Sequence, residues 1–387
     1  MHKIYKILSQ YLFVAMIFTT AQAQFKFQEH TLATDLRGGY QVVIADLNRD
    51  GKPDIIALAS GMKELVWFEN PNWTRHIIIN NGTQMINCAA YDTDGDGIPE
   101  IALAQEFAND PRKSIGTVSI LKHKDDPTQF WEAMEIDRLP SSHRLRFADI
   151  FGNGKKVLVN APLAGAQVAP SEYKGNVPLV FYRPDSWKRE VISSALEGVL
   201  HGISILDLDR DGREDILTAS FVGVDSFRFG KDAKWLRNKL VAGDPAPWPK
   251  GGASEISVGM LGKERFLATI EPWHGNQVAV YRFGKNDWER VVIDDKLIDG
   301  HTLLTADLNH DGRDEIIAGY RGTGRSVYIY SFDPKSKKWV RQSLDEGGIA
   351  AAACAIADLN GDGKPDVACI GSATMNLKWY ENLGAKR

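Results

Sequence analysis

The feature that most constrains this chain is an acidic loop of nine residues between two short apolar runs. The loop, Asp46–Asp54, reads DLNRDGKPD, and it lies between Val42–Ala45 and Ile55–Leu58. Side-chain oxygens at alternate positions, a glycine that permits a sharp turn and a closing acid make a ring of the hard ligands that Ca²⁺ prefers. Helix-flanked calcium loops close with Glu at the twelfth position, whereas this acid comes at the ninth and the flanks read as strands. The sequence therefore predicts strand, calcium loop, strand.

The same loop recurs along the chain and supplies a register. Intact copies begin at residues 46, 92, 207, 307 and 358, and a worn copy begins at residue 149. The interval of 100 residues between 207 and 307 is about twice the others, so a seventh unit is expected near residue 258. The segment 256–269 reads there as strand, tight turn and strand without the acidic ligands.

The oxygen-bearing positions of the five intact loops are the expected ligands of structural Ca²⁺. They are Asp46, Asn48, Asp50, Asp54, Asp92, Asp94, Asp96, Glu100, Asp207, Asp209, Asp211, Asp215, Asp307, Asn309, Asp311, Glu315, Asp358, Asn360, Asp362 and Asp366.

Each unit continues with a third strand rich in aromatic residues and then a fourth strand, as in 64–68 followed by 74–78. Four strands in a unit of about 40–50 residues are typical of a β-propeller blade. The last unit ends in a third strand at 377–382, and residues 27–32 read as the missing fourth strand. We predict an all-β fold, a seven-bladed β-propeller with four-stranded blades. Residues 24–387 would form this single domain, whose ring is closed by the N-terminal strand.

The acidic loops and the strand pattern resemble the FG-GAP or VCBS type of propeller repeat, with its Asp-x-Asn/Asp-x-Asp-Gly-x-x-Asp/Glu loops. The resemblance covers essentially all of the chain after residue 23. It implies the propeller fold and the calcium loops, and it implies little about activity because one fold hosts many functions.

The N-terminus and the net charge bear on where the protein works. Residues 1–23 combine two lysines, an apolar run at 11–18 and a small-residue cleavage site before Gln24, which predicts a signal peptide. The apolar run is too short to cross a bilayer, so we expect no membrane span and a secreted or periplasmic protein. A formal net charge of −4 gives no bulk attraction to nucleic acid. The oligomeric state stays open.

Three cysteines, Cys88, Cys354 and Cys369, are too few for a disulfide scaffold. Cys354 and Cys369 lie on two strands joined by one acidic loop and could be neighbours. Because each cysteine sits in an apolar run, buried free thiols are the favoured interpretation.

The register also aligns residues on the opposite face of the ring. In a propeller the loop between first and second strands lies on one face, and the starts of the first strands lie on the other, near the channel. The acidic loops are therefore expected away from the functional site. The residues six places before the first Asp of each loop, here called the register residues, are Tyr40, Ile86, His143, His201, His301 and Ala352. Three of them are histidines, and His274 is expected to converge on them from the loop 271–276.

Several other groups are expected on the channel face. The predicted catalytic set is His143, His201, His274, His301, Arg144 and Arg146, and the predicted substrate-binding set is Tyr40, Glu271, Trp273, Tyr173, Arg321 and Trp248. The insertions at 161–176 and 243–253 are expected to form the walls of a pocket on this face. Aromatic walls with Arg and His donors suit a sugar. Glu106 and Glu271 also leave open a paired-carboxylate glycosidase.

A second, narrower resemblance concerns three segments, 143–149, 160–163 and 270–276, which look like parts of the propeller domain of aldos-2-ulose dehydratase. Propeller-type polysaccharide lyases share the idea of a His-rich channel. Both imply β-elimination, in which a base removes a proton, a cation stabilises the enolate and an acid assists the leaving group. His201 or His301 would be base and acid, and Arg144 or Arg146 the anion stabiliser. His143 and His274 would be pocket residues or metal ligands.

The leading hypothesis is thus a secreted lyase or dehydratase that acts on a uronic-acid-containing or keto-sugar substrate, as an oligosaccharide or polysaccharide. One alternative is a non-catalytic, Ca²⁺-stabilised propeller that binds glycan or protein. Another is a metal-dependent hydrolase, because a cluster of His143, His201, His274 and His301 could hold a further divalent metal.

Overall fold

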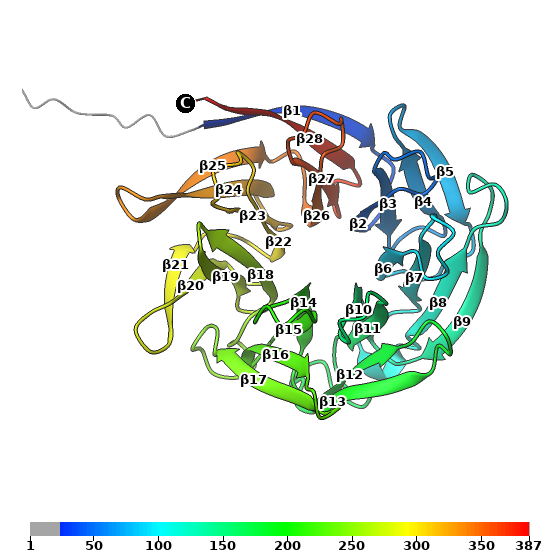
Figure 1. Cartoon of the computed structure of the whole chain (residues 1–387), viewed down its shortest axis with the longest axis horizontal. Helices are drawn as coiled ribbons and strands as arrows, with labels where there is room; N and C mark the ends of the chain where they lie inside the picture. Colours follow the sequence, from blue (N-terminus) through cyan, green and yellow to red (C-terminus); the bar gives the residue numbers. More distant parts are fainter. Residues whose placement is uncertain (1–23, 387) are drawn as a thin grey trace, which may run out of the picture.

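Seven four-stranded antiparallel sheets stand around a central axis in the computed structural model, which describes residues 24–386 (Figure 1). The predicted all-β, seven-bladed propeller with four-stranded blades is confirmed. Each blade runs outward from a first strand at the channel, and the first strands of neighbouring blades contact one another around the ring. The predicted signal peptide, residues 1–23, lies outside the described residues.

The blades are numbered here in chain order, and their strands have the following bounds. Blade 1 consists of β2 (Gly39–Ala45), β3 (Asp54–Ala59), β4 (Leu65–Glu69) and β5 (Thr74–Ile79). Blade 2 consists of β6 (Asn87–Tyr91), β7 (Glu100–Gln105), β8 (Thr117–Lys122) and β9 (Glu132–Arg138). Blade 3 consists of β10 (Ser142–Ala148), β11 (Val157–Pro162), β12 (Asn176–Tyr182) and β13 (Arg189–Glu197). Blades 4 and 5 consist of β14 (Leu200–Leu206), β15 (Asp215–Ser220), β16 (Gly223–Phe229) and β17 (Trp235–Val241); and β18 (Glu255–Leu261), β19 (Glu264–Glu271), β20 (Gln277–Phe283) and β21 (Trp288–Asp294). Blades 6 and 7 consist of β22 (Gly300–Ala306), β23 (Glu315–Tyr320), β24 (Ser326–Asp333) and β25 (Lys338–Glu346); and β26 (Ala351–Ala357), β27 (Asp366–Gly371), β28 (Leu377–Lys386) and β1 (Gln24–Ala33).

The ring closes by pairing the two ends of the described chain. β1 runs antiparallel to β28 as the outer strand of blade 7, as predicted from residues 27–32. The His30 ring stacks on the Trp379 indole with ring centroids 4.3 Å apart, and Phe25 is buried. The β28 edge therefore meets a partner instead of solvent.

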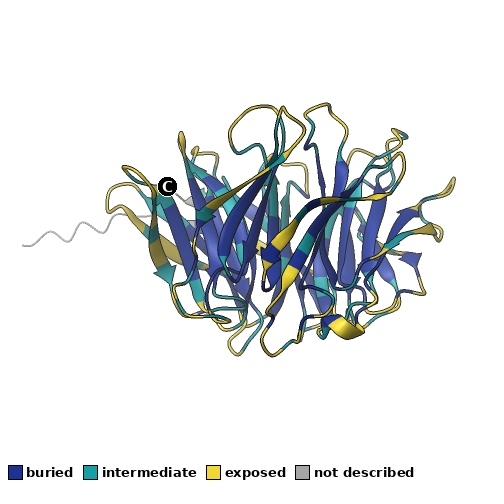
Figure 2. Ribbon diagram, turned by 90° about the horizontal axis from the view of Figure 1, so that it is seen from below, coloured by how far each residue is buried: buried dark blue, intermediate teal, exposed yellow. Residues whose placement is uncertain are grey.

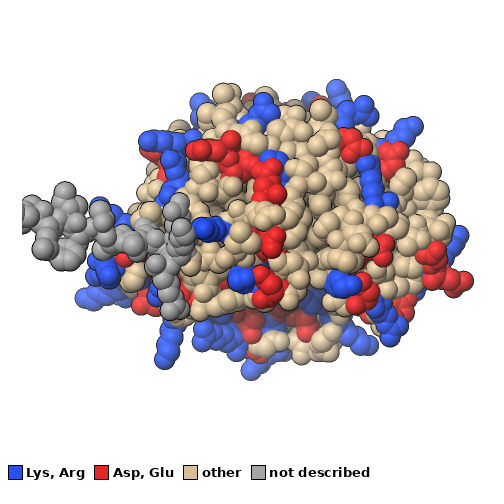
Figure 3. All heavy atoms as spheres, turned by 90° about the horizontal axis from the view of Figure 1, so that it is seen from above, with Lys and Arg blue, Asp and Glu red and all other residues tan. Residues whose placement is uncertain are grey.

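Burial follows from the position of each strand in its blade. The second strands, such as β3 and β15, are buried at every residue because both faces of the sheet pack against neighbouring blades. The outer strands, such as β9 and β21, are largely exposed or half-buried. Figure 2 shows the buried strands between two exposed layers of loops, and Figure 3 shows basic and acidic side chains interspersed on the face that it presents.

The core is divided among the blades. Each of the seven interfaces between neighbouring blades holds one cluster of buried apolar side chains, for example Ile56, Trp67 and Leu103 between blades 1 and 2. An eighth cluster lies on the channel face and contains Tyr173 and Phe221, with Trp248 and Trp273 packed against it. The insertions 161–176 and 243–253 contribute to this aromatic wall.

The unit without acidic ligands folds as predicted. β18 and β19 are joined by the tight turn at Gly262 and Lys263, close to the expected position near residue 258. The one helix among residues 24–386 is a single 3₁₀ turn, Pro111–Lys113. In this described part of the chain, no helix has the length and apolar character needed to span a membrane.

The cysteine prediction was wrong for two of the three residues. Cys354 and Cys369 form a disulfide between β26 and β27, and only Cys88 is a buried free thiol. The two strands pair with Cys354 directly opposite Cys369, at a Cα–Cα distance of 4.1 Å. An apolar run predicts that a residue is buried, but it does not predict which residue of the neighbouring strand lies opposite it. The sequence therefore favoured free thiols over a disulfide.

Candidate functional site

A pocket of about 560 Å³, here called the channel pocket, opens where the first strands begin. Its lining includes Tyr40, His143 and His201 from first strands, and Trp273 and His274 from the loop between β19 and β20. A smaller cavity of about 70 Å³ lies further along the same strands and is lined by residues that include Arg144, Arg146, Glu255 and His301. The predicted convergence of the register histidines with His274 is therefore present in the structure.

A β-bulge explains why the register residues face the channel. In blades 1, 3, 4, 6 and 7 the pairing of first and second strands skips one residue. The skipped residues are Tyr40, His143, His201, His301 and Ala352. A bulge leaves one residue outside the ladder and re-aims its side chain. His274 reaches the same place from a left-handed backbone, with φ 49°.

Three of the imidazoles, His201, His274 and His301, form a cluster here called the histidine trio. Each has its Nδ1 beside an oxygen acceptor: Glu255 Oε1 at 2.8 Å from His201, Asp299 Oδ1 at 3.4 Å from His274, and Ala352 O at 2.5 Å from His301. At His201 and His301 these contacts assign the proton to Nδ1 and leave the lone pair on Nε2, whereas His274 Nδ1 lies 3.4 Å both from the Asp299 oxygen and from the Arg321 Nη2 donor.

The Nε2 atoms of the trio lie close to one another. His201 Nε2 lies 3.1 Å from His274 Nε2, and one ligand atom from each of the three residues lies within 4.8 Å of the others. His301 Nε2 is buried without a hydrogen-bond partner. Metal–nitrogen bonds of about 2.0–2.1 Å would hold two such nitrogens roughly 3 Å apart. The trio therefore has the donor chemistry and the spacing of a divalent-metal site.

Beside the trio lies a hydrogen-bonded group made by Tyr40, His143 and Arg144. The Tyr40 hydroxyl is 2.8 Å from His143 Nε2, and Arg144 Nη1 donates to the same nitrogen at 3.1 Å. Arg144 Nη2 donates to Glu255 Oε1 at 3.1 Å, so one carboxylate contacts both Arg144 and His201. Since His143 Nε2 accepts these bonds, its proton is on Nδ1, which has no partner.

The surroundings keep the four imidazoles neutral. Burial, with the adjacent arginines, holds the pKa values of His143, His201 and His301 well below their usual range. Burial and the Arg321 guanidinium lower the pKa of His274 to about 4. Burial also raises the pKa of Glu255 and, with Arg144, lowers that of Arg146 to about 10. Neutral imidazoles can bind a metal or accept a proton.

Acid is expected to destabilise the fold through His143. In the unfolded chain this imidazole takes up a proton near its ordinary pKa of 6.5, whereas the folded state resists protonation. Because the folded pKa is depressed, this contribution to stability is full above pH 6.5 and is lost as the pH falls below it. The loss should be about 1.4 kcal/mol per pH unit for one histidine.

Chemical unfolding of the wild type and of His143→Asn at about pH 7.5 and about pH 5.5 measures this effect. The variant should lose less stability on acidification, by about 1.4 kcal/mol. Equal losses in the two proteins would show that folding does not lower the pKa of His143.

Two further predicted residues lie at the channel pocket. Arg321 lines it, donates to both carboxylate oxygens of Asp299 at 3.0 and 3.1 Å, and lies 3.4 Å from His274 Nδ1. Trp273 also lines it, and Tyr173 packs edge-on behind that indole with centroids 5.3 Å apart. Tyr173 thus supports the wall instead of lining the pocket.

Glu271 requires a correction, because its side chain turns into blade 5 instead of toward the channel. It is fully buried and accepts hydrogen bonds from Thr269, Tyr281 and Arg290, the last through two nitrogens at 2.6 and 2.8 Å. The carboxylate of Glu106 contacts Thr117. The two acids do not face each other across the channel pocket, and the paired-carboxylate hypothesis loses its support.

Arg146 and Trp248 are also misplaced by the sequence prediction. Arg146 lines the smaller cavity, where its Nη1 donates to Asn87 Oδ1 and to the Leu145 carbonyl. The Trp248 indole donates to the Glu172 carbonyl and packs on Phe221 in the outer part of the aromatic wall. The spacing of residues along the sequence does not predict the directions in which these two side chains point, and those directions place them there.

Sequence reasoning missed two carboxylates, Glu255 and Asp299, which orient the trio. Glu255 begins the first strand of blade 5, the blade that lost its acidic loop, so no register was available there. Asp299 stands two residues before His301. An acid just upstream of a register histidine was the available signal for Asp299.

The acidic loops lie at the opposite ends of the first strands. In the loop of blade 1 the Asp46 carboxylate accepts the backbone N–H groups of Asp50 and Gly51, and buried Asp54 accepts that of Leu47. The loops of blades 2, 4, 6 and 7 repeat the contact with the glycine N–H at Asp92, Asp207, Asp307 and Asp358. Burial and neighbouring carboxylates raise the pKa of Asp54 to about 6. Such clustered oxygens suit a hard cation.

The fold and the two sets of residues define the chain as a seven-bladed β-propeller with acidic repeat loops and a histidine-rich channel pocket. It carries FG-GAP-like repeats, which match at residues 46–103 and 307–369. Residues 115–284 match the β-propeller domain of aldos-2-ulose dehydratase. Both resemblances drawn from the sequence motifs are confirmed.

Two known proteins extend this comparison. Integrin alpha pat-2 of Caenorhabditis briggsae is 29% identical over 181 residues, which are 43% of this chain and 12% of the integrin. The chain thus spans about an eighth of the length of that relative. The solved structure of the Dos1 propeller superposes with a TM-score of 0.54 at 8% identity, over 88% of this chain and 78% of that one. This likeness concerns the fold alone.

Proposed function

We propose that the protein is a carbohydrate-active carbon–oxygen lyase or dehydratase that works by β-elimination in the channel pocket. The observation that carries the proposal is the meeting of four neutral imidazoles with buried arginine at one end of the channel. The match of residues 115–284 to a sugar dehydratase propeller supports a sugar as the substrate. The proposed substrate is a uronic-acid-containing or keto-sugar oligosaccharide or polysaccharide.

The charges around the pocket support a substrate that is or becomes anionic. Arg321 lines the channel pocket and Arg144 and Arg146 line the adjoining smaller cavity, and these three arginines stand against two carboxylates, Glu255 and Asp299. The excess of one positive charge favours a carboxylate or a developing enolate in a site shielded from water. The Trp273 indole offers a face of the kind on which sugar rings stack.

The histidine trio would hold a divalent metal. Its grouped Nε2 atoms, of which that of His301 is unpartnered, and its Nδ1 contacts to Glu255, Asp299 and the Ala352 carbonyl fit such an ion. A bound metal supplies Lewis-acid stabilisation of negative charge on a carbonyl or enolate oxygen. With His201 and His301 engaged in this way, the proposed proton transfer moves from them to Tyr40 and His143.

The Tyr40–His143 pair can carry the proton of an elimination. The Tyr40 oxygen takes the proton from the carbon next to the carbonyl or carboxylate, while the Tyr40 hydroxyl proton passes to His143 Nε2. The electron pair left on carbon forms the double bond as the β carbon–oxygen bond breaks. The departing oxygen then takes up a proton from the pair. Arg144, which contacts both His143 and Glu255, orients the group.

Incubation with uronic-acid oligosaccharides and with keto-sugars tests the proposal. Ultraviolet absorbance of an unsaturated product should appear with the wild type and with His310→Gln, an exposed histidine in an acidic loop. It should be absent with Tyr40→Phe. New reducing ends without unsaturation would instead support the metal-dependent hydrolase, and glycan binding without turnover would support the binding module. Either result overturns the elimination proposal.

The proposal includes two further parts that the chemistry of the chain supports. The acidic loops would bind structural Ca²⁺, which would offset the repulsion among their carboxylates. Export by the predicted signal peptide would place the protein outside the cytoplasm, where extracellular Ca²⁺ is available and where the Cys354–Cys369 disulfide persists.

A further inference from the structure

We infer that a groove between blades 2 and 3 is a second carbohydrate-binding site, which takes neutral sugar residues of an oligosaccharide or polysaccharide chain. This side groove has a volume of about 760 Å³, and its lining includes Tyr91, Phe151 and Trp187. Sites for small ligands typically have volumes of about 300–1,000 Å³. The side groove lies beside the first-to-second-strand loops of the two blades, on the face opposite the channel pocket. The inference therefore goes beyond the proposed elimination.

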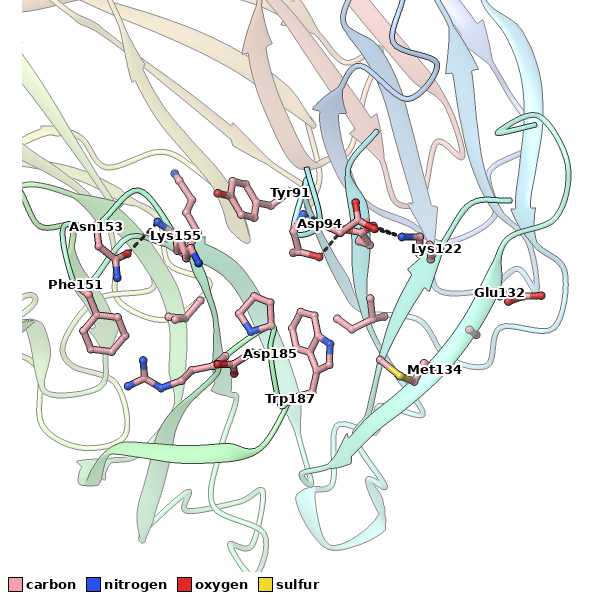
Figure 4. Close-up of a pocket in the computed structure, with 18 residues that line it drawn as sticks. Tyr91, Asp94, Lys122, Glu132, Met134, Phe151, Asn153, Lys155, Asp185 and Trp187 are labelled. Atoms are coloured by element: carbon pink, nitrogen blue, oxygen red, sulfur yellow. Dashed lines mark hydrogen bonds and ion pairs between the residues drawn. The ribbon is translucent and has the colours of Figure 1, made fainter. Parts of the chain in front are cut away.

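The three aromatic side chains of the side groove are half-buried. Tyr91 and Trp187 pack against the apolar cluster between blades 2 and 3, and Phe151 packs against the cluster between blades 3 and 4. Figure 4 shows Trp187 between side chains of blade 2, Lys122 and Met134, and the Phe151 ring of blade 3. Each ring is thus held by packing on one part and open to the groove on another, as a surface for stacking the face of a sugar requires.

The same place beside blade 1 shows what would fill such a groove. Trp73 occupies the same turn as Trp187, because both have a left-handed backbone, with φ of 57° and 51°, and both donate their N–H to the carbonyl four residues earlier. Blade 7 places the Trp379 indole beside Trp73, with ring centroids 5.8 Å apart. The His30 ring stacks on that indole. Two stacked rings therefore fill the space beside the turn tryptophan of blade 1.

Blade 2 carries smaller side chains at the positions of these two rings. Ile120 and Trp379 both pair with the third residue of the second strand of their blade. Met134 lies opposite Ile120 on the fourth strand, as His30 lies opposite Trp379. Met134 is 49% exposed, so this aliphatic pair leaves open beside Trp187 the space that is filled in blade 7.

Blade 3 contributes the other wall through its worn loop. The third and ninth positions of this loop, which carry oxygen ligands in the five intact copies, are Phe151 and Val157. Both residues line the side groove. The Arg183 guanidinium lies 4.3 Å from the centroid of the Phe151 ring and pairs with Glu190 at 2.7 Å, which fixes it against the ring. An aromatic wall thus replaces oxygen ligands in this copy of the loop.

The charges of the side groove favour a ligand without net charge. Four bases and four acids line it, namely Lys122, Lys155, Lys156, Arg183, Asp94, Glu100, Glu132 and Asp185. Lys122, Lys156 and Arg183 are each paired with an acid. Without an excess of positive charge the groove does not concentrate a polyanion. Aromatic rings with interspersed polar groups suit the apolar faces and hydroxyl groups of neutral sugars.

Native electrophoresis through gels that contain a β-glucan, a galactomannan or an arabinan tests the inference, because binding to the polymer retards the protein. The wild type should be retarded by at least one of these neutral polymers relative to a gel without polymer. Trp187→Ala should weaken this binding by at least about 10-fold, whereas Trp187→Phe keeps a ring and should retain most of it. Trp73→Ala is the matched control, because Trp73 occupies the same turn outside the side groove, and it should bind as the wild type does.

A wild type that none of the three polymers retards would overturn the inference, and so would equal retardation of the wild type and Trp187→Ala. Turnover of short oligosaccharides should be the same in Trp187→Ala as in the wild type, because the side groove is separate from the channel pocket. Retardation that depends on Trp187, without turnover of any substrate, would overturn the proposed elimination and keep the side groove. Thermal melting shows that each variant is folded.

Discussion

Replacing His301 by alanine is expected to abolish both metal binding and elimination activity. His301 Nε2 is a buried, unpartnered nitrogen whose ring is held by the Ala352 carbonyl. Its loss leaves only two imidazoles of the trio, which cannot hold a catalytic metal in the usual set of three protein ligands. We expect kcat/KM to fall by at least about 10³-fold, equivalent to about 4 kcal/mol of transition-state stabilisation.

The measurement combines steady-state kinetics on the substrate with the strongest turnover and elemental analysis of transition metals in the purified protein. His310→Ala is the control, because His310 is exposed in an acidic loop. His301→Asn provides a second variant with a smaller change in volume, and thermal melting checks that both variants fold. Full activity without a bound metal in either His301 variant would remove the trio from the mechanism.

Replacing Glu271 by alanine is expected to destabilise the fold by about 3–5 kcal/mol, the typical cost of breaking a buried ion pair. The Glu271 carboxylate is fully buried and accepts hydrogen bonds from Tyr281 and from two nitrogens of Arg290. Its removal leaves the Tyr281 phenol without its acceptor and leaves the Arg290 guanidinium without its hydrogen-bonded carboxylate partner, with Gln277 Oε1 as its remaining hydrogen-bond acceptor.

Denaturant unfolding of Glu271→Ala and Glu264→Ala tests this expectation. Glu264 is on the same strand, β19, and pairs with Arg282, but its side chain is 70% exposed. Exposed ion pairs contribute about 0–1 kcal/mol, so the control should be close to the wild type. At a temperature where Glu271→Ala is folded, turnover should be preserved. A stable variant without activity would return Glu271 to the catalytic residues.

Much of the candidate site was predictable because the fold repeats. The acidic loops gave the register, and the register placed Tyr40, His143, His201 and His301 at equivalent starts of the first strands. Rotation about the axis converts equivalent positions in sequence into neighbours in space. The β-bulges at these four positions direct the side chains toward the channel, where they meet.

The register carried less information where a blade departs from the repeat. Glu255 was missed because blade 5 has no acidic loop to count from, although it contacts both Arg144 and His201. Glu271 was misjudged because it neighbours His274 in sequence, while its strand directs the carboxylate to Arg290. Alternation of side chains along a strand can separate residues that are close in the chain.

The sequence by itself determined the all-β class, the number of blades, the strand that closes the ring and the face on which the histidines start. These properties depend on patterns that are repeated many times, so the loss of acidic residues from one copy of the loop did not change the prediction. Tertiary structure alone decided the Cys354–Cys369 disulfide and the carboxylates that orient the trio. Each of these depends on which side chain stands opposite which across neighbouring strands. That pairing is fixed by register and packing between segments far apart in the chain, and periodicity within a segment does not report it.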